Sequence, residues 1–113
     1  MVTSLGSFLT DNKGVLLAYD HGLEHGPSDF DATTVDPQFV VDLASKAGFN
    51  GIILQKGVAE RYYDGKVPLI LKLNGKTNLV QGDPVSRQIC SVEEALALGA
   101  KAIGYTIYPG SIH

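Results

Sequence analysis

The residues best suited to chemistry follow a short apolar run near the start of the chain. Residues 15–20 read Val-Leu-Leu-Ala-Tyr-Asp, and the apolar part is typical of a strand covered on both faces. Asp20 ends this run, so its carboxylate would lie at the strand tip, partly out of water. Such burial raises the pKa of a carboxylate and suits it to proton transfer. The alternative is that Asp20 only bonds the amides of Gly22 or Leu23, as aspartates in turns often do.

The five residues after Asp20 match the His-x-x-Glu-His pattern of one class of zinc peptidases: His21, Gly22, Leu23, Glu24 and His25. That chemistry requires both histidines on one face of a stable helix. Gly22 weakens a helix and the Gly-Pro pair at 26–27 ends it at once, so we expect no zinc. We expect His21 or His25 to bond a substrate hydroxyl or phosphate instead. The simpler alternative is a solvated histidine in a loop.

A second polar segment follows a later apolar run. Residues 74–77 read Asn-Gly-Lys-Thr, like the end of a nucleotide-binding P-loop, but that motif needs glycine where this chain has Ile70. The sequence therefore predicts no P-loop, although Lys72, Asn74 and Lys76 could attract an anionic substrate. Cys90 has no histidine near it in the sequence and is expected to be a buried apolar residue.

Apolar runs alternate with segments of helical spacing. The sequence predicts strands over 15–20, 51–55, 68–73 and 102–107, and helices over 37–47, 58–63 and 92–98. Asp36 and Ser91 are the expected N-caps, and Glu94 completes a capping box with Ser91. Residues 74–90 are expected to form a loop too long and too polar for a simple connector. Strands that alternate with crossovers of about a dozen residues predict an α/β fold with a parallel sheet.

Ligands of parallel α/β proteins bind at the carboxyl ends of the strands. Four loops therefore matter, at residues 20–26, 55–57, 72–77 and 106–111. Four strands in an open sheet would leave two edges unpaired, whereas a closed barrel needs eight strands and about 250 residues. We expect residues 1–113 to be one partial domain, the first half of a TIM (βα)8 barrel with about four parallel strands.

The composition excludes several classes of protein. The net charge is −3 and the nine basic residues are scattered, so no nucleic-acid partner is expected. No apolar stretch approaches the roughly 20 residues of a membrane span, and the first residues lack the pattern of a signal peptide. A single cysteine excludes an internal disulfide and favours the reducing cytoplasm.

Six stretches resemble the archaeal-type class I fructose-1,6-bisphosphate aldolases, in order and over nearly the whole chain. They are residues 17–22 continuing through 24–27, 47–51, 55–60, 62–65, 68–77 and 104–111. The resemblance implies a TIM barrel of which these are roughly the first four strands. It also implies cleavage of fructose 1,6-bisphosphate into glyceraldehyde 3-phosphate and dihydroxyacetone phosphate through a Schiff base, without a metal or other cofactor.

The resemblance assigns roles to the segment after the first strand. Asp20 matches an aspartate that lies beside the reactive lysine and assists proton transfer, and residues 21–25 match the lining of the substrate site. The Schiff-base lysine, the catalytic tyrosine and the main phosphate-binding glycines of the family lie on later strands. Lys56, Lys72 and Lys101 do not match the nucleophile, so we expect the 113 residues alone to be inert. A cytoplasmic homo-oligomer acting on a small sugar phosphate is expected.

Two other functions remain open. A sister enzyme, 2-amino-3,7-dideoxy-D-threo-hept-6-ulosonate synthase, shares the Asp-His-Gly turn and the Schiff-base chemistry, whereas the segments at 62–65 and 73–77 favour the bisphosphate aldolase. A non-catalytic half-barrel that pairs through its exposed strand edges, with a second copy or a partner chain, is the alternative from a different class.

Overall fold

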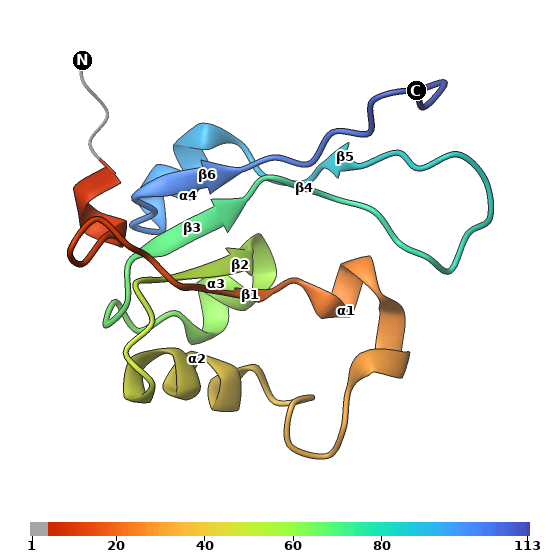
Figure 1. Ribbon diagram of the computed structural model, residues 1–113. Helices are drawn as coiled ribbons and strands as arrows, with labels where there is room; N and C mark the ends of the chain where they lie inside the picture. Colours follow the sequence, from red (N-terminus) through yellow and green to blue (C-terminus); the bar gives the residue numbers. More distant parts are fainter. Residues whose placement is uncertain (1–4) are drawn as a thin grey trace.

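The chain builds one parallel sheet with helices between its strands, as the sequence predicts. The computed structural model describes residues 5–113, apart from the side chains of residues 26 and 27. Within that range the parallel sheet has the strand order β1, β2, β3 and β6 (Figure 1). These strands span Leu16–Tyr19, Gly51–Gln55, Leu69–Lys72 and Ala102–Gly104.

The longer helices between these strands are α2 at Pro37–Lys46, α3 at Lys56–Tyr62 and α4 at Val92–Ala97. Two of these three helices begin where the sequence predicts caps, whereas α3 begins two residues before its predicted start and has no side-chain cap. The Asp36 carboxylate accepts a hydrogen bond from the Gln38 amide at 3.0 Å, and Ser91 and Glu94 form the reciprocal capping box. Each cap satisfies amides at a helix start that have no partner within the helix, which fixes where the helix begins.

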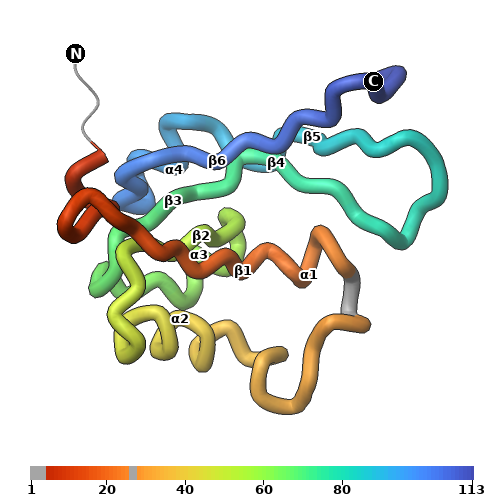
Figure 2. The backbone as a smooth tube through the Cα atoms, viewed as in Figure 1, coloured from red at the N-terminus to blue at the C-terminus, as the bar shows by residue number. Residues whose placement is uncertain are grey.

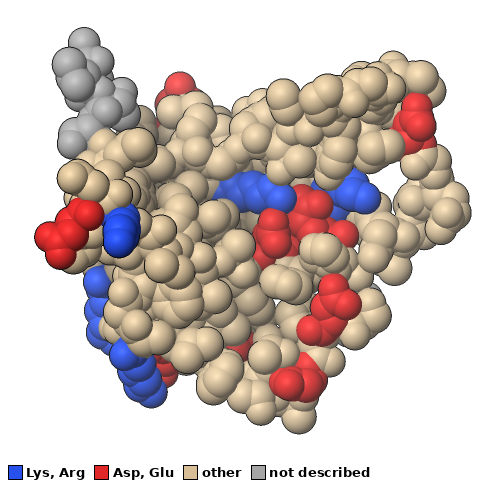
Figure 3. Space-filling view, in the orientation of Figure 1, with Lys and Arg blue, Asp and Glu red and all other residues tan. Residues whose placement is uncertain are grey.

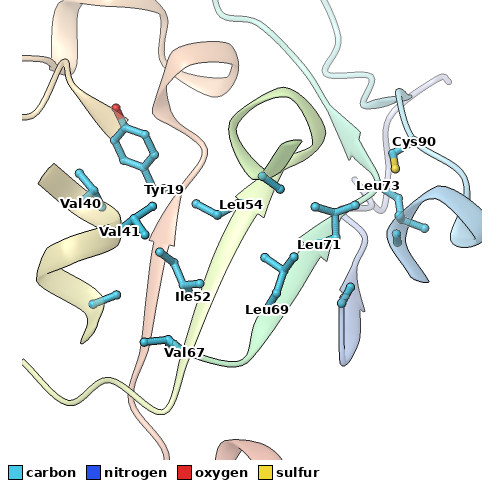
Figure 4. Packing of buried hydrophobic residues seen from close by; sticks show 14 residues of the cluster. Tyr19, Val40, Val41, Ile52, Leu54, Val67, Leu69, Leu71, Leu73 and Cys90 are labelled. Atoms are coloured by element: carbon cyan, nitrogen blue, oxygen red, sulfur yellow. The ribbon is translucent and has the colours of Figure 1, made fainter. Parts of the chain in front are cut away.

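The core lies between the sheet and its helices. Ile52, Leu54, Leu69 and Leu71 are at most 1% exposed. Figure 4 shows these side chains on the side of the sheet that Val40 and Val41 of α2 approach, and Cys90 is buried at the edge of the same cluster, as predicted. Because side chains alternate along a strand, the residues between them face the other side of the sheet. That second face continues into the carboxyl-end loops.

The predicted elements differ from the structure in three places. Residues 21–29 contain a four-residue helix α1 (His21–Glu24) and a 3-10 turn η2 (Gly26–Asp29), where the sequence predicted no helix. The connection 74–90 contains a short antiparallel pair, β4 (Asn74–Gly75) with β5 (Arg87–Gln88). The last strand ends at Gly104 and not at residue 107, because beyond Gly104 the chain leaves the β3 ladder. A further 3-10 turn, η1 (Leu5–Phe8), precedes β1.

The chain after β6 runs beside the long connection between β4 and β5 (Figure 2). The Ser111 hydroxyl donates to the Pro84 carbonyl at 2.8 Å, and the Ile112 amide donates to the Asp83 carboxylate at 3.2 Å. These bonds hold together two of the loops that follow the strands.

Asn74 ties the end of β3 to the end of β6. Its side chain is fully buried, its amide nitrogen donates to the Thr106 carbonyl at 2.8 Å, and its oxygen accepts from the Thr106 amide at 2.9 Å. The expectation that Asn74 attracts an anionic substrate is therefore wrong, because its polar atoms are used within the fold. Asn74 instead positions the carboxyl ends of two neighbouring strands.

Replacing Asn74 by alanine is expected to lower the free energy of unfolding by about 2 kcal/mol, because the Thr106 amide and carbonyl lose their buried partner. Urea unfolding of the intact protein measures this. Asn78→Ala, at an exposed position of the connection, serves as the control and should change stability by less than about 0.5 kcal/mol. Equal stability of the two variants would contradict the assigned role of Asn74.

Candidate functional site

Asp20 lies at the point where β1 ends and α1 begins. Its backbone carbonyl accepts hydrogen bonds from the Leu23 and Glu24 amides at 3.3 and 3.1 Å, which forms the short helix. Its side chain makes no capping bond, so the alternative interpretation of Asp20 as a mere loop cap is wrong. The turn of helix brings Glu24 back toward the strand tip, beside Asp20.

The carboxylates of Asp20 and Glu24 share one ammonium group, that of Lys72. Lys72 Nζ lies 2.7 Å from Asp20 Oδ2 and 2.7 Å from Glu24 Oε1, and the Lys72 and Glu24 residues are 9% and 8% exposed. Glu24 Oε1 also accepts from the backbone amide of Lys76 at 3.4 Å. We call Asp20, Glu24 and Lys72 the Lys72 cluster. With two carboxylates and one ammonium, it carries one net negative charge.

The Lys72 ammonium is held in its protonated form. Burial alone would lower the pKa of Lys72, but the hydrogen bonds to Asp20 and Glu24 outweigh it and raise this pKa above its ordinary value. A Schiff-base lysine must instead be a neutral amine, which needs a lowered pKa. The geometry therefore agrees with the expectation that Lys72 is not the nucleophile.

The neighbouring ammonium also changes the expectation for Asp20. That expectation considered burial alone, whereas Lys72 Nζ lies 2.7 Å from Asp20 Oδ2 and donates a hydrogen bond to it. A carboxylate at this position can accept a proton.

The register of the sheet sets three polar side chains at one level. Gln55 and Lys72 are register partners, and Asp20 follows Tyr19, which pairs with Leu54. Since side chains alternate along each strand, these three point away from the helices that cover Leu54. We call Asp20, Gln55 and Lys72 the polar layer. Gly104 pairs with Lys72 on the far side and adds no side chain to this level.

Two cavities adjoin the polar layer. One of about 470 Å³ is lined by Asp20, Gly22, Leu23 and Gln55, among others. The other, of about 410 Å³, also touches Leu23, and Lys76 and Arg87 contribute its basic groups. In Figure 3 basic and acidic side chains meet in a hollow on this face of the molecule. The predicted residues Asp20, Gly22 and Leu23 therefore share one cavity, with Glu24 bound beside it through Lys72.

The two histidines lie apart from that cavity. His21 and His25 are one helical turn apart, with ring centroids 5.2 Å from each other. His21 lines a separate cavity of about 210 Å³ with Tyr19 and Asp29, and its Nδ1 is buried without a hydrogen-bond partner among the described residues. His25 is exposed, with Nδ1 3.4 Å from the Asp29 carboxylate. Their predicted role in substrate binding stays a prediction.

Lys56, Tyr62 and Tyr63 lie in the helical layer. Lys56 Nζ donates to Glu94 at the start of α4, and this hydrogen bond lowers the pKa of Glu94 to about 2 and raises that of Lys56. Lys56 thus links α3 to α4 as a protonated cation. Tyr62 and Tyr63 pack against the core, and the Tyr63 hydroxyl donates to the Val67 carbonyl at 2.9 Å.

Two features of the site were missed from the sequence. The pairing of Lys72 with Glu24 joins residues 48 positions apart, and no local sequence pattern predicts it. The sequence places Gln55 at the end of the second predicted strand and in the loop after it but assigns it no role, although its position level with Asp20 at the end of the first strand is a usable signal.

Neither a metal centre nor a membrane span was found in the described part of the chain. Residues 5–113 contain no group of three or more histidine, cysteine or acidic side chains placed to hold a metal ion. Their helices are all too short or too polar to cross a membrane.

Comparisons with known proteins point to one family. The model of the family described as DeoC/LacD family aldolase matches residues 14–111. The class 1 fructose-bisphosphate aldolase of Thermoproteus tenax is 60% identical over 106 residues, which cover 92% of this chain and 40% of that protein. A 2-amino-3,7-dideoxy-D-threo-hept-6-ulosonate synthase of Halobacterium salinarum is 29% identical over 111 residues, 96% of this chain and 41% of that protein.

A solved structure of a Schiff base forming fructose-1,6-bisphosphate aldolase superposes with a TM-score of 0.86 at 62% identity, covering 88% of this chain and 41% of that chain. The four parallel strands and their helices are thus a partial TIM barrel, as predicted. The chain spans about 40% of the length of the relatives it matches.

Replacing Lys72 by methionine is expected to lower the free energy of unfolding at pH 7 by about 3 kcal/mol, because the buried Glu24 and the partly buried Asp20 lose their only ammonium partner among the described residues. Adding Glu24→Gln should recover part of the loss. Lys46→Met is the control, since its side chain is 79% exposed, and should change stability by less than about 0.5 kcal/mol. Urea unfolding of the intact protein measures all three, and a fully stable Lys72→Met protein would contradict the cluster.

The contribution of Lys72 should also depend on pH in a defined direction. Its pKa is raised in the folded state, so its stabilisation is complete below the ordinary pKa of 10.5 and is lost as the pH rises through the higher folded value. As the pH is raised from 7, the stability difference between wild type and Lys72→Met should therefore begin to shrink only above about pH 10.5. A difference that already shrinks between about pH 7 and 9 would indicate a lowered pKa.

Proposed function

The chain belongs to the DeoC/LacD family of aldolases, and we propose that it forms the amino-terminal part of a Schiff-base aldolase that cleaves fructose 1,6-bisphosphate. The products are glyceraldehyde 3-phosphate and dihydroxyacetone phosphate. The observation that carries the proposal is the Asp20 carboxylate, which lies directly after β1 beside a cavity of about 470 Å³ and is paired with a buried ammonium. The 60% identity to a fructose-bisphosphate aldolase supports the substrate.

The chemistry divides between this chain and a lysine outside it. A neutral lysine amine condenses with the ketone of the open-chain sugar and releases water, which leaves an iminium ion. The hydroxyl proton on the fourth carbon is then removed, the bond between the third and fourth carbons breaks, and its electron pair moves to the iminium to give an enamine. The aldehyde leaves, and protonation and hydrolysis of the enamine release the second triose phosphate and restore the amine.

We assign Asp20 to the proton transfers in this sequence. Its carboxylate, which accepts a hydrogen bond from Lys72, can accept a proton and return it later. Lys72 and Lys56 are unsuited to be the nucleophile because their pKa values are raised. We therefore place the Schiff-base lysine in the part of the protein that corresponds to the remaining length of the relatives, and expect residues 1–113 by themselves to form no adduct.

The phosphate groups require positive charge away from the acidic Lys72 cluster. Lys76 and Arg87 line the adjoining cavity of about 410 Å³, and the predicted attraction of an anionic substrate by Lys76 remains part of the proposal. The proposal also keeps a substrate-binding role for residues 21–25, a cytoplasmic location and a homo-oligomer. Residues 1–113 act in it as one partial domain.

The sister synthase is the second candidate, and its 29% identity makes it the less favoured one. Assays of the intact protein with the substrates of both reactions separate the two enzymes. Borohydride trapping with dihydroxyacetone phosphate separates either enzyme from a non-catalytic half-barrel: an adduct on the intact protein supports an aldolase, and a lack of any adduct supports the half-barrel.

Replacing Asp20 by asparagine is expected to lower kcat for fructose 1,6-bisphosphate by about 10²- to 10⁴-fold, because the amide cannot carry the proton. Borohydride trapping should still show the Schiff base, since the nucleophile is untouched. Asp11→Asn is a matched control with full activity, because Asp11 lies in a turn before β1 with a φ of +50° that asparagine tolerates. A kcat within twofold of wild type would remove Asp20 from the mechanism.

A further inference from the structure

Gln55 is a buried polar residue whose amide is not used by the fold. It ends β2, is 9% exposed, and its Nε2 has no hydrogen-bond partner among the described residues. Other buried polar residues at this edge, Asn74 and Lys72, have their polar atoms paired. An unpaired buried amide destabilises a protein, so its presence calls for a partner that is not part of this segment.

The surroundings of the Gln55 amide cannot supply that partner. Nε2 lies 2.7 Å from the place that a Cβ on Gly75 would occupy, and the Leu23 side chain closes over the same glycine. These groups are closely packed, and the Leu23 side chain presents only apolar atoms. The terminal torsion of glutamine is broad, so either the nitrogen or the oxygen of the amide can turn to a ligand.

The cavity beside Gln55 is the one that Asp20 lines. Both residues border the space of about 470 Å³, and both belong to the polar layer with Lys72. A group held between Asp20 and Gln55 would therefore meet a carboxylate on one side and a neutral amide on the other.

We propose that Gln55 is a substrate-positioning residue whose side-chain amide hydrogen-bonds a hydroxyl group of the open-chain sugar phosphate. This hydroxyl is either the one that faces Asp20 or the one on the neighbouring carbon. This inference rests on the proposed aldolase function. It extends that function by naming a residue on the second strand that orients the carbon chain of the substrate.

The charge of the site selects a hydroxyl over a phosphate. The Lys72 cluster carries one net negative charge, which disfavours a phosphate at the polar layer. A hydroxyl suits the position, because it can donate to the Asp20 carboxylate while its oxygen accepts from the Gln55 amide. A site built to hydrogen-bond a hydroxyl also discriminates strongly against substrates that lack it.

The test is Gln55→Met in the intact protein, with fructose 1,6-bisphosphate as substrate. We expect kcat/KM to fall by about 10- to 100-fold, as for the loss of one buried hydrogen bond to substrate. The thermal midpoint should stay unchanged or rise, because an unpaired polar group is replaced by an apolar one of similar size. Gln38→Met, at an exposed position of α2, is the matched control and should leave both quantities unchanged.

The outcomes separate the inference from the proposed function. If wild type cleaves the bisphosphate and Gln55→Met does so with kcat/KM within twofold, the positioning role is wrong and the aldolase function stands. If wild type cleaves nothing, both are wrong. Gln55→Leu serves as the second variant: a marked fall in the thermal midpoint of both variants would show that Gln55 is structural and would also overturn the inference.

Discussion

The ammonium group of Lys72 lets a buried and a partly buried carboxylate share the carboxyl end of the sheet. Asp20 follows β1 and Glu24 ends the short helix after it, and each lies 2.7 Å from the same nitrogen. Without that cation, the two carboxylates would repel each other at a site where little water is present to weaken the repulsion. The backbone depends on the same contact, because Glu24 also accepts from the amide of Lys76 and so connects α1 to the segment after β3. The charged contacts of Lys72 thus link the carboxyl ends of β1 and β3, which lie on either side of β2.

The same interaction divides the chemistry. Hydrogen bonds to two carboxylates raise the pKa of Lys72, so it stays protonated and cannot attack a ketone, whereas the carboxylate of Asp20 beside it can accept a proton. The segment described therefore suits proton transfer and substrate orientation, and the proposed nucleophile lies outside it. Gln55 lies in register between Asp20 and Lys72, so the proposed substrate contacts involve the whole polar layer and not the charged pair alone.

Much of this architecture is predictable because its signals are local. The four strands are apolar runs bounded by glycine and proline, and the caps at Asp36 and Ser91 depend on residues two or three positions away. The failures share a physical cause. The helix α1 consists of one turn and contains Gly22, so propensity disfavours it, and contacts with Lys72 stabilise it instead. Likewise, nothing near Asn74 in the sequence reveals that Thr106 uses its amide, because β3 and β6 meet only in the folded sheet.

The protonation state of Lys72 tests this account most directly. Nitrogen-detected NMR of the intact protein, with the Lys72 signal assigned through Lys72→Arg, can follow its side-chain nitrogen as the pH is raised. The account predicts a signal that stays that of an ammonium past the ordinary pKa of 10.5 and titrates only above it. Titration well below that value, near neutral pH, would contradict the account and would make Lys72 a candidate for the Schiff-base nucleophile.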